Sequence, residues 1–64
     1  MFNNSIRQKR QDLGLSQTKL ASMIGLAEPT LSDIELGKRK PWPKVKRALA
    51  RVLKAKPEEL FPEG

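Results

Sequence analysis

Residues 17–36 read QTKLASMIGLAEPTLSDIEL, in which two short helical patterns are joined at a glycine. In the first pattern, Leu20, Ala21 and Ile24 have the i, i+1, i+4 spacing of one helix face. Gly25 follows directly and is suited to the left-handed conformation that commonly ends a helix. These residues predict an amphipathic helix that stops at the glycine.

The second pattern predicts a helix over 28–36. Pro29 falls in its first turn, where the missing N–H costs nothing, and Leu31 and Ile34 form its buried side. The small side chain of Ala21 suits the point where the two helices meet. Together these features are the helix-turn-helix pattern, whose second helix lies in the major groove of duplex DNA.

Glycines and prolines divide the rest of the chain into segments with helical spacing, and none shows clear strand alternation. We expect Asn3 or Asn4 to cap the first helix, and Ile6, Arg10 and Leu13 to share one of its faces. The five predicted helices cover 4–13, 16–24, 28–36, 44–53 and 57–60. The fold class predicted is therefore all-α, a compact five-helix domain.

We expect residues 1–64 to form a single domain, with the helix-turn-helix at 17–36. Thirteen Lys and Arg residues against seven Asp and Glu give a net charge of +6, which favours a polyanionic partner. No apolar run is long enough to span a bilayer, and no secretory signal is visible. We therefore expect a cytoplasmic protein that does not bind a membrane.

The composition argues against enzymatic chemistry. The chain has no His, Cys or Tyr, so disulfides and the usual zinc ligand sets are missing. The seven acidic residues show no metal-loop spacing, and a core of this size leaves little room for a pocket. We expect no catalytic residue, no metal, no cofactor and no small-molecule substrate.

The chain resembles a known family, the helix-turn-helix domains of the phage repressor and Cro type. The resemblance rests on Leu13-Gly14-Leu15-Ser16-Gln17, Leu20-Ala21, Ile24-Gly25-Leu26, Thr30-Leu31-Ser32, Ile34-Glu35 and Gly37-Lys38-Arg39. It extends from about Ile6 to Phe61. It implies a five-helix fold, sequence-specific binding to double-stranded DNA, and a two-fold homodimer on a pseudo-palindromic operator.

The resemblance also implies roles for matching positions. Gln17 opens the first helix of the pair and would touch the DNA backbone or an edge base. The positions that face or flank the groove are Ala27, Glu28, Pro29, Thr30, Ser32 and Asp33, and those that would grip phosphates are Lys38, Arg39 and Lys40. Two features depart from the family pattern. Ala27 stands where Ser or Thr usually caps the reading helix, and the reading face carries the acids Glu28 and Asp33.

Several charged and aromatic residues can be interpreted from their positions alone. Arg10 and Glu35 each lie on or beside the inner face of a helix, where a lone charge is costly, so we expect them to pair. Trp42 lies between two prolines and is either a plug on the core or part of a dimer surface. The cations of the fourth helix are interpreted first as a solvated surface, with one or two phosphate contacts as the alternative: Lys44, Lys46, Arg47, Arg51, Lys54 and Lys56.

The leading functional hypothesis is a transcriptional regulator. A second is a protein-binding adaptor or antitoxin-like module on the same scaffold, which Glu28 and Asp33 favour because acids repel phosphate. A third is a membrane-surface helix over 44–56, which ranks last because its apolar face is needed for the core.

Overall fold

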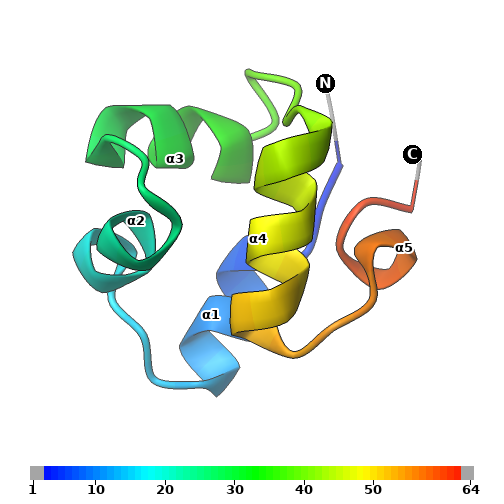
Figure 1. Cartoon of the computed structure of the whole chain (residues 1–64), viewed down its shortest axis with the longest axis horizontal. Helices are drawn as coiled ribbons and strands as arrows, with labels where there is room; N and C mark the ends of the chain where they lie inside the picture. The colour runs from blue at the N-terminus through cyan, green and yellow to red at the C-terminus, as the bar shows by residue number, and fades with distance from the viewer. Residues whose placement is uncertain (1–2, 63–64) are drawn as a thin grey trace.

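The computed structural model describes residues 3–62, and five helices account for most of them (Figure 1). These helices are α1 (Ile6–Asp12), α2 (Gln17–Ile24), α3 (Glu28–Glu35), α4 (Pro43–Leu53) and α5 (Pro57–Leu60), and the described residues contain no strand. The predicted all-α, five-helix fold is confirmed, and each helix bound lies within two residues of its predicted position. No helix of the described residues is long and apolar enough to cross a membrane.

The starts of the helices follow the predicted capping only in part. Ser16 caps α2 as expected, because its side chain accepts the backbone N–H of Lys19 at 3.0 Å. The first helix begins two residues later than predicted, with Ser5 as its N-cap residue. The Ser5 hydroxyl donates to the carbonyl of Glu59 at 3.0 Å, so it ties this end of α1 to α5. The adjacent Asn4 Oδ1 accepts the N–H of Ile6 at 3.2 Å, a local contact of the kind predicted for it.

One apolar core unites the five helices. Its buried members are Ile6, Leu20, Ala21, Leu31, Ile34, Val45, Leu49, Leu53, Leu60 and Phe61. The periodicity placed Ile6, Leu20, Ala21, Leu31 and Ile34 correctly, but Leu13 is 42% exposed rather than buried. Ile6 is the only buried residue of α1, so the core covers the start of this helix and not its end, where Leu13 is the C-cap residue. The core therefore depends on α2, α3 and α4 more than on the end of α1.

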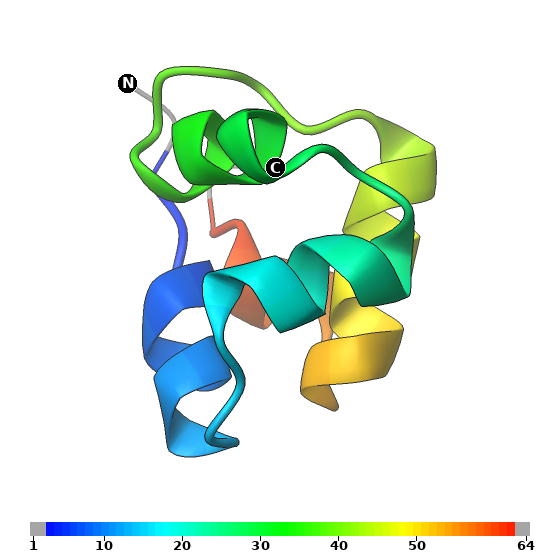
Figure 2. The ribbon, with the colours of Figure 1, turned by 90° about the vertical axis from the view of Figure 1, so that its left-hand side faces the viewer.

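The helices α3 and α4 lie on different sides of the molecule. In Figure 1, α3 crosses the top, and α4 runs downward in front of α1. After a 90° turn, α2 and α3 face the viewer and α4 stands at the right-hand edge (Figure 2). Near the chain ends, the Ser5 N–H donates to the Leu60 carbonyl at 3.0 Å, which holds α5 against the start of α1.

Candidate nucleic-acid interface

The turn between α2 and α3 fixes the relative placement of the two helices. Gly25 is left-handed, with φ 72°, and the Leu26 N–H donates to the Ala21 carbonyl at 2.9 Å. A Cβ added at Gly25 would meet no atom within 4 Å, so its backbone conformation alone favours glycine here. Ala21 is 3% exposed, and Leu26 packs against the core from beyond the turn. The turn residues therefore do what the sequence required of them.

The predicted reading helix, α3, presents a short, polar outer face. Leu31 and Ile34 are completely buried and anchor its other side. Of the predicted groove residues, four are exposed (Ala27, Glu28, Pro29 and Asp33) and two are half-buried (Thr30 and Ser32). Ala27 is the N-cap residue and makes no side-chain capping bond. Glu28 lies in the first turn, where its charge complements the positive end of the helix dipole.

The C-terminal end of α3 leads directly into the basic connector. Gly37 is left-handed, with φ 77°, and the Lys38 N–H donates back to the Asp33 carbonyl at 2.9 Å. The helix end is also held from outside, because the Asn4 side-chain amide donates to the Ile34 carbonyl at 2.8 Å. The three connector cations Lys38, Arg39 and Lys40 are all exposed. They are thus gathered just beyond the end of the reading helix.

Trp42 is exposed rather than plugged into the core. It is 38% exposed and forms the N-cap position of α4, while its neighbour Pro41 is buried. The guanidinium carbon of Arg39 lies 5.6 Å from the centroid of the indole ring, within cation–π range. The structure therefore does not support the core-plug interpretation. It shows instead a contact that orders one cation of the connector.

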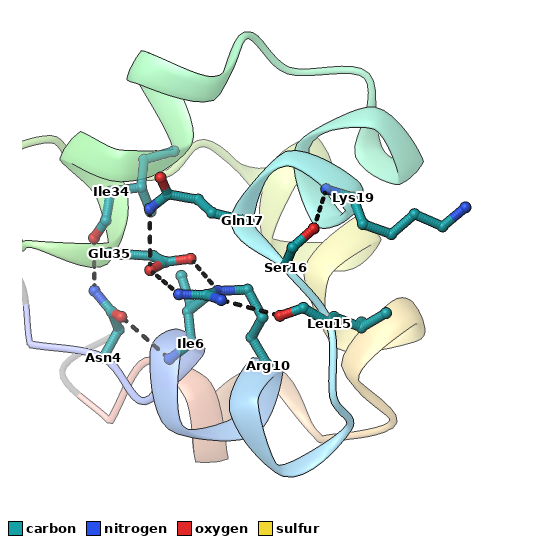
Figure 3. A network of polar contacts seen from close by, with 9 residues as sticks. All are labelled: Asn4, Ile6, Arg10, Leu15, Ser16, Gln17, Lys19, Ile34 and Glu35. Atoms are coloured by element: carbon teal, nitrogen blue, oxygen red, sulfur yellow. Dashed lines mark hydrogen bonds and ion pairs between the residues drawn. The ribbon is translucent and has the colours of Figure 1, made fainter.

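The predicted partners Arg10 and Glu35 do form an ion pair, and it is largely enclosed (Figure 3). Arg10 Nε donates to Glu35 Oε2 at 2.9 Å, and a terminal guanidinium nitrogen donates to Oε1 at 3.2 Å. The other terminal nitrogen donates to the Leu15 carbonyl at 3.0 Å. The side chains are only 12% and 3% exposed, so the pair joins α1, the loop before α2, and the end of α3.

Gln17 joins the same network, which the sequence did not indicate. Its Nε2 donates to Glu35 Oε1 at 3.4 Å, and its side chain lies beside the carboxylate in Figure 3. Gln17 is half-buried at the first position of α2. A residue predicted from resemblance as a DNA contact is therefore positioned by the residue that ends α3. The only hint in the sequence was the placement of a long amide at the start of the helix pair.

Known proteins match this chain over most of its length. The family model described as Helix-turn-helix matches residues 6–60. The chain belongs to the helix-turn-helix family. An uncharacterised HTH-type transcriptional regulator from Archaeoglobus fulgidus is 36% identical over 56 residues, which are 88% of this chain and 80% of that protein. The chain spans only 40% of a Mycobacterium tuberculosis regulator that it matches with the same identity.

Solved helix-turn-helix structures agree in fold. The restriction-modification controller protein C.AhdI from Aeromonas hydrophila superposes with a TM-score of 0.79 at 36% identity, over 88% of this chain and 85% of that protein. The P22 c2 repressor, solved in complex with a synthetic operator, gives a TM-score of 0.85 at 27% identity, over 92% and 89% of the two chains. The predicted family and fold are therefore confirmed.

The charges of this helix-turn-helix domain are unevenly placed around α3. The outer face carries the acids Glu28 and Asp33, whereas the connector that follows carries Lys38, Arg39 and Lys40. Such a surface offers carboxylate acceptors along α3 and cationic donors beyond its C-terminal end. Base edges and the DNA backbone are the two kinds of group that these donors and acceptors suit.

Proposed function

We propose that this protein is a transcriptional regulator that binds duplex DNA sequence-specifically, with α3 in the major groove. The observation that carries the proposal is the exposed face of α3, backed by two fully buried residues, Leu31 and Ile34, and followed by three exposed cations. A helix with its side chains is about 10–12 Å across, so α3 with its short outer side chains suits a groove about 12 Å wide. We propose no enzymatic activity for the chain.

The proposal divides the site residues between two tasks. Base-edge or groove-flanking contacts are assigned to Ala27, Glu28, Pro29, Thr30, Ser32 and Asp33. Phosphate contacts are assigned to Lys38, Arg39, Lys40 and the free donor of Gln17. Asp33 is the distinctive member of the first group, because an ionised carboxylate only accepts hydrogen bonds and its partner among the bases is the cytosine N4 amine.

We also propose that two copies act together on a pseudo-palindromic operator. One α3 presents only a few side chains to the bases, and helix-turn-helix dimers double the readout with half-sites one helical turn apart, about 34–36 Å. Exposed apolar side chains such as Trp42 and Leu36 offer candidate surfaces for the second copy. Analytical ultracentrifugation of the protein with and without operator DNA tests this part of the proposal.

The exposed acids of α3 support a second candidate function. Glu28 and Asp33 are exposed at the centre of the proposed reading face, where phosphate would repel them. These acids favour the alternative of a protein-binding adaptor or antitoxin-like module whose α3 docks on a basic protein surface. In that case the chain would show no base preference, although its cations would still retain weak binding to any DNA.

The test is selection of duplexes from a random-sequence library by the purified protein, followed by sequencing of the bound fraction. We expect an enriched motif with two related half-sites, and binding to it that exceeds binding to random duplex by at least about a thousandfold. The matched control is the double variant Ser32→Ala, Asp33→Ala, which should lose the motif and keep weak binding to all DNA. Enrichment of no motif by the unaltered protein would reject sequence-specific binding and favour the adaptor.

A further inference from the structure

The outer side of α4 carries a line of exposed cations that the proposed site does not use. Lys44, Arg47 and Arg51 are three and four residues apart, which places them on one face of the helix, and Lys54 follows as its C-cap residue. All four are exposed, and this α4 basic face lies opposite the buried residues Val45, Leu49 and Leu53.

Among the described residues, no acid forms an ion pair with the α4 basic face. The sequence has no Asp or Glu between Glu35 and Glu58, while nine cations lie in that interval. Within residues 3–62, Glu35 is engaged by Arg10 and Glu59 by Lys9, and none of the four face residues forms an ion pair. Like charges three and four residues apart on a helix repel one another. Ion pairing within the described residues therefore does not account for the α4 basic face.

The C-terminal half of α4 lies away from the predicted reading helix. In Figures 1 and 2, α3 lies at the top of the molecule and α4 runs downward from that level toward the bottom. Figure 2 shows α2 and α3 toward the viewer and α4 at the edge. From Lys44 to Arg51 the helix rises about 10 Å, so the far end of the face lies well away from a duplex that α3 enters.

We propose that the α4 basic face binds the phosphate backbone of a second duplex segment while α3 occupies the first, so that the protein bridges two segments of DNA. This inference rests on the proposed function, since it adds a second DNA surface to a DNA-binding domain. The spacing of four cations within about 15 Å matches the spacing of phosphates along DNA, where each strand carries one negative charge per 3.4 Å of helix axis.

The composition of the face favours DNA over a protein partner. Protein interfaces are built around apolar and aromatic anchors, but the apolar side chain between these cations on the outer side of α4 is small, Ala48. A second copy of the chain is disfavoured because it would bring like charges together. Sequence-independent binding of phosphate needs only cations and no anchor.

The experiment is a two-duplex capture assay. A biotinylated duplex carrying the selected motif is fixed to beads and loaded with protein, and a fluorescent duplex of random sequence is then added at low salt. The test variant is Arg47→Gln, Arg51→Gln, and the matched control is Arg7→Gln, Lys9→Gln, which removes the same charge from α1. A third variant, Arg47→Lys, Arg51→Lys, keeps the charge, and circular dichroism checks that all variants are folded.

We expect the unaltered protein, the control and the charge-keeping variant to capture the second duplex, and the test variant to capture at least about tenfold less. Removing two phosphate contacts should also reduce the salt slope of random-duplex binding by about 1.8. Equal capture by test and control variants, or no capture by the unaltered protein, would overturn the proposal. So would binding of labelled polyglutamate to the face under conditions where random duplex does not bind, which indicates an acidic protein partner.

The two proposals fail in distinguishable ways. Preference for the selected motif over its single-base variants depends on α3, and its loss would count against the proposed function alone. The salt slope of random-duplex binding depends on cations, and an unchanged slope in the Arg47→Gln, Arg51→Gln variant would count against the α4 basic face alone.

Discussion

Arg10 and Glu35 face each other side-on, with Arg10 Nε and a terminal guanidinium nitrogen each donating to a different carboxylate oxygen at 2.9 and 3.2 Å. The pair connects α1 to the last residue of α3, and Gln17 adds a bond from the start of α2. The position of the reading helix therefore depends on a nearly enclosed charge pair as well as on apolar packing. Two such charges stabilise one another only while both are present.

The first prediction concerns this pair. Glu35→Gln should lower the free energy of unfolding by about 3 kcal/mol, because it leaves the Arg10 charge enclosed without a counter-charge. Urea denaturation followed by circular dichroism measures the change. As a control, Lys9→Gln removes an exposed pair with an N–O distance of 3.9 Å and should change stability by less than about 1 kcal/mol. The apolar double variant Arg10→Met, Glu35→Leu should recover most of the loss, and a Glu35→Gln protein as stable as the original would contradict the prediction.

The second prediction concerns the turn before the reading helix. Gly25→Ala should lower the free energy of unfolding by about 1–2 kcal/mol, because the left-handed conformation is unfavourable for a residue with a Cβ. No steric clash contributes, since that Cβ would meet no atom within 4 Å. Thermal denaturation is the measurement, with a change of about 4–8 °C expected for each kcal/mol.

The matched control has the opposite sign. Lys54 is left-handed, with φ 54°, at the equivalent position after α4, so Lys54→Gly should raise the melting temperature. The prediction is contradicted if both substitutions shift the melting temperature in the same direction. Left-handed backbone conformation would then not explain the stability effects at these two positions.

Much of the fold was predictable because its signals are local. The ends of α2 and α3 follow from Ser16, Gly25 and Gly37, whose capping and backbone preferences act within one turn of the chain. The buried residues followed from 3.6-residue periodicity as far as the helices extend. Leu13 was misplaced because the core covers only the start of α1, and periodicity alone does not show how far along a helix the core extends.

The side chains of the site were predictable only in part. The Arg10–Glu35 pair followed from a general rule, that a charge on an inner face needs a partner. The bond from Gln17 to Glu35 and the stacking of Arg39 on Trp42 depend on how separate elements meet, which no local pattern encodes. The roles of the groove residues in binding DNA stay predictions, because they concern a complex with a second molecule.

The third prediction concerns the connector cations. Lys40→Ala should weaken binding to the selected motif and to random duplex about equally, and reduce the salt slope by about 0.9. The reason is that a phosphate contact adds affinity but carries no base information. Fluorescence anisotropy with labelled duplexes at several salt concentrations measures both quantities. A changed base preference at an unchanged slope would show that Lys40 reads bases instead.

Arg39→Ala should give the same loss with an additional signal. Trp42 is the only tryptophan of the chain, and Arg39 lies over its ring. The substitution should therefore change the tryptophan emission of the free protein, whereas Lys40→Ala should leave it unchanged. Identical emission from both variants would indicate that the stacking is not maintained in solution.

The last prediction assigns base readout to Asp33. Its carboxylate is exposed on α3, between the two buried anchors in sequence, and can only accept hydrogen bonds while ionised. Asp33→Ala should relax the preference at one base pair of the selected motif by about 1–3 kcal/mol, because the cytosine N4 amine loses its acceptor. Non-specific affinity should rise at the same time, since a charge that repels phosphate has been removed.

Leu31→Ala is the contrasting variant: it should cost about 2–5 kcal/mol of stability and lose binding through unfolding. Binding of Asp33→Ala to the motif and to all its single-base variants decides the matter, and full retention of every preference would assign Asp33 to the protein-docking alternative.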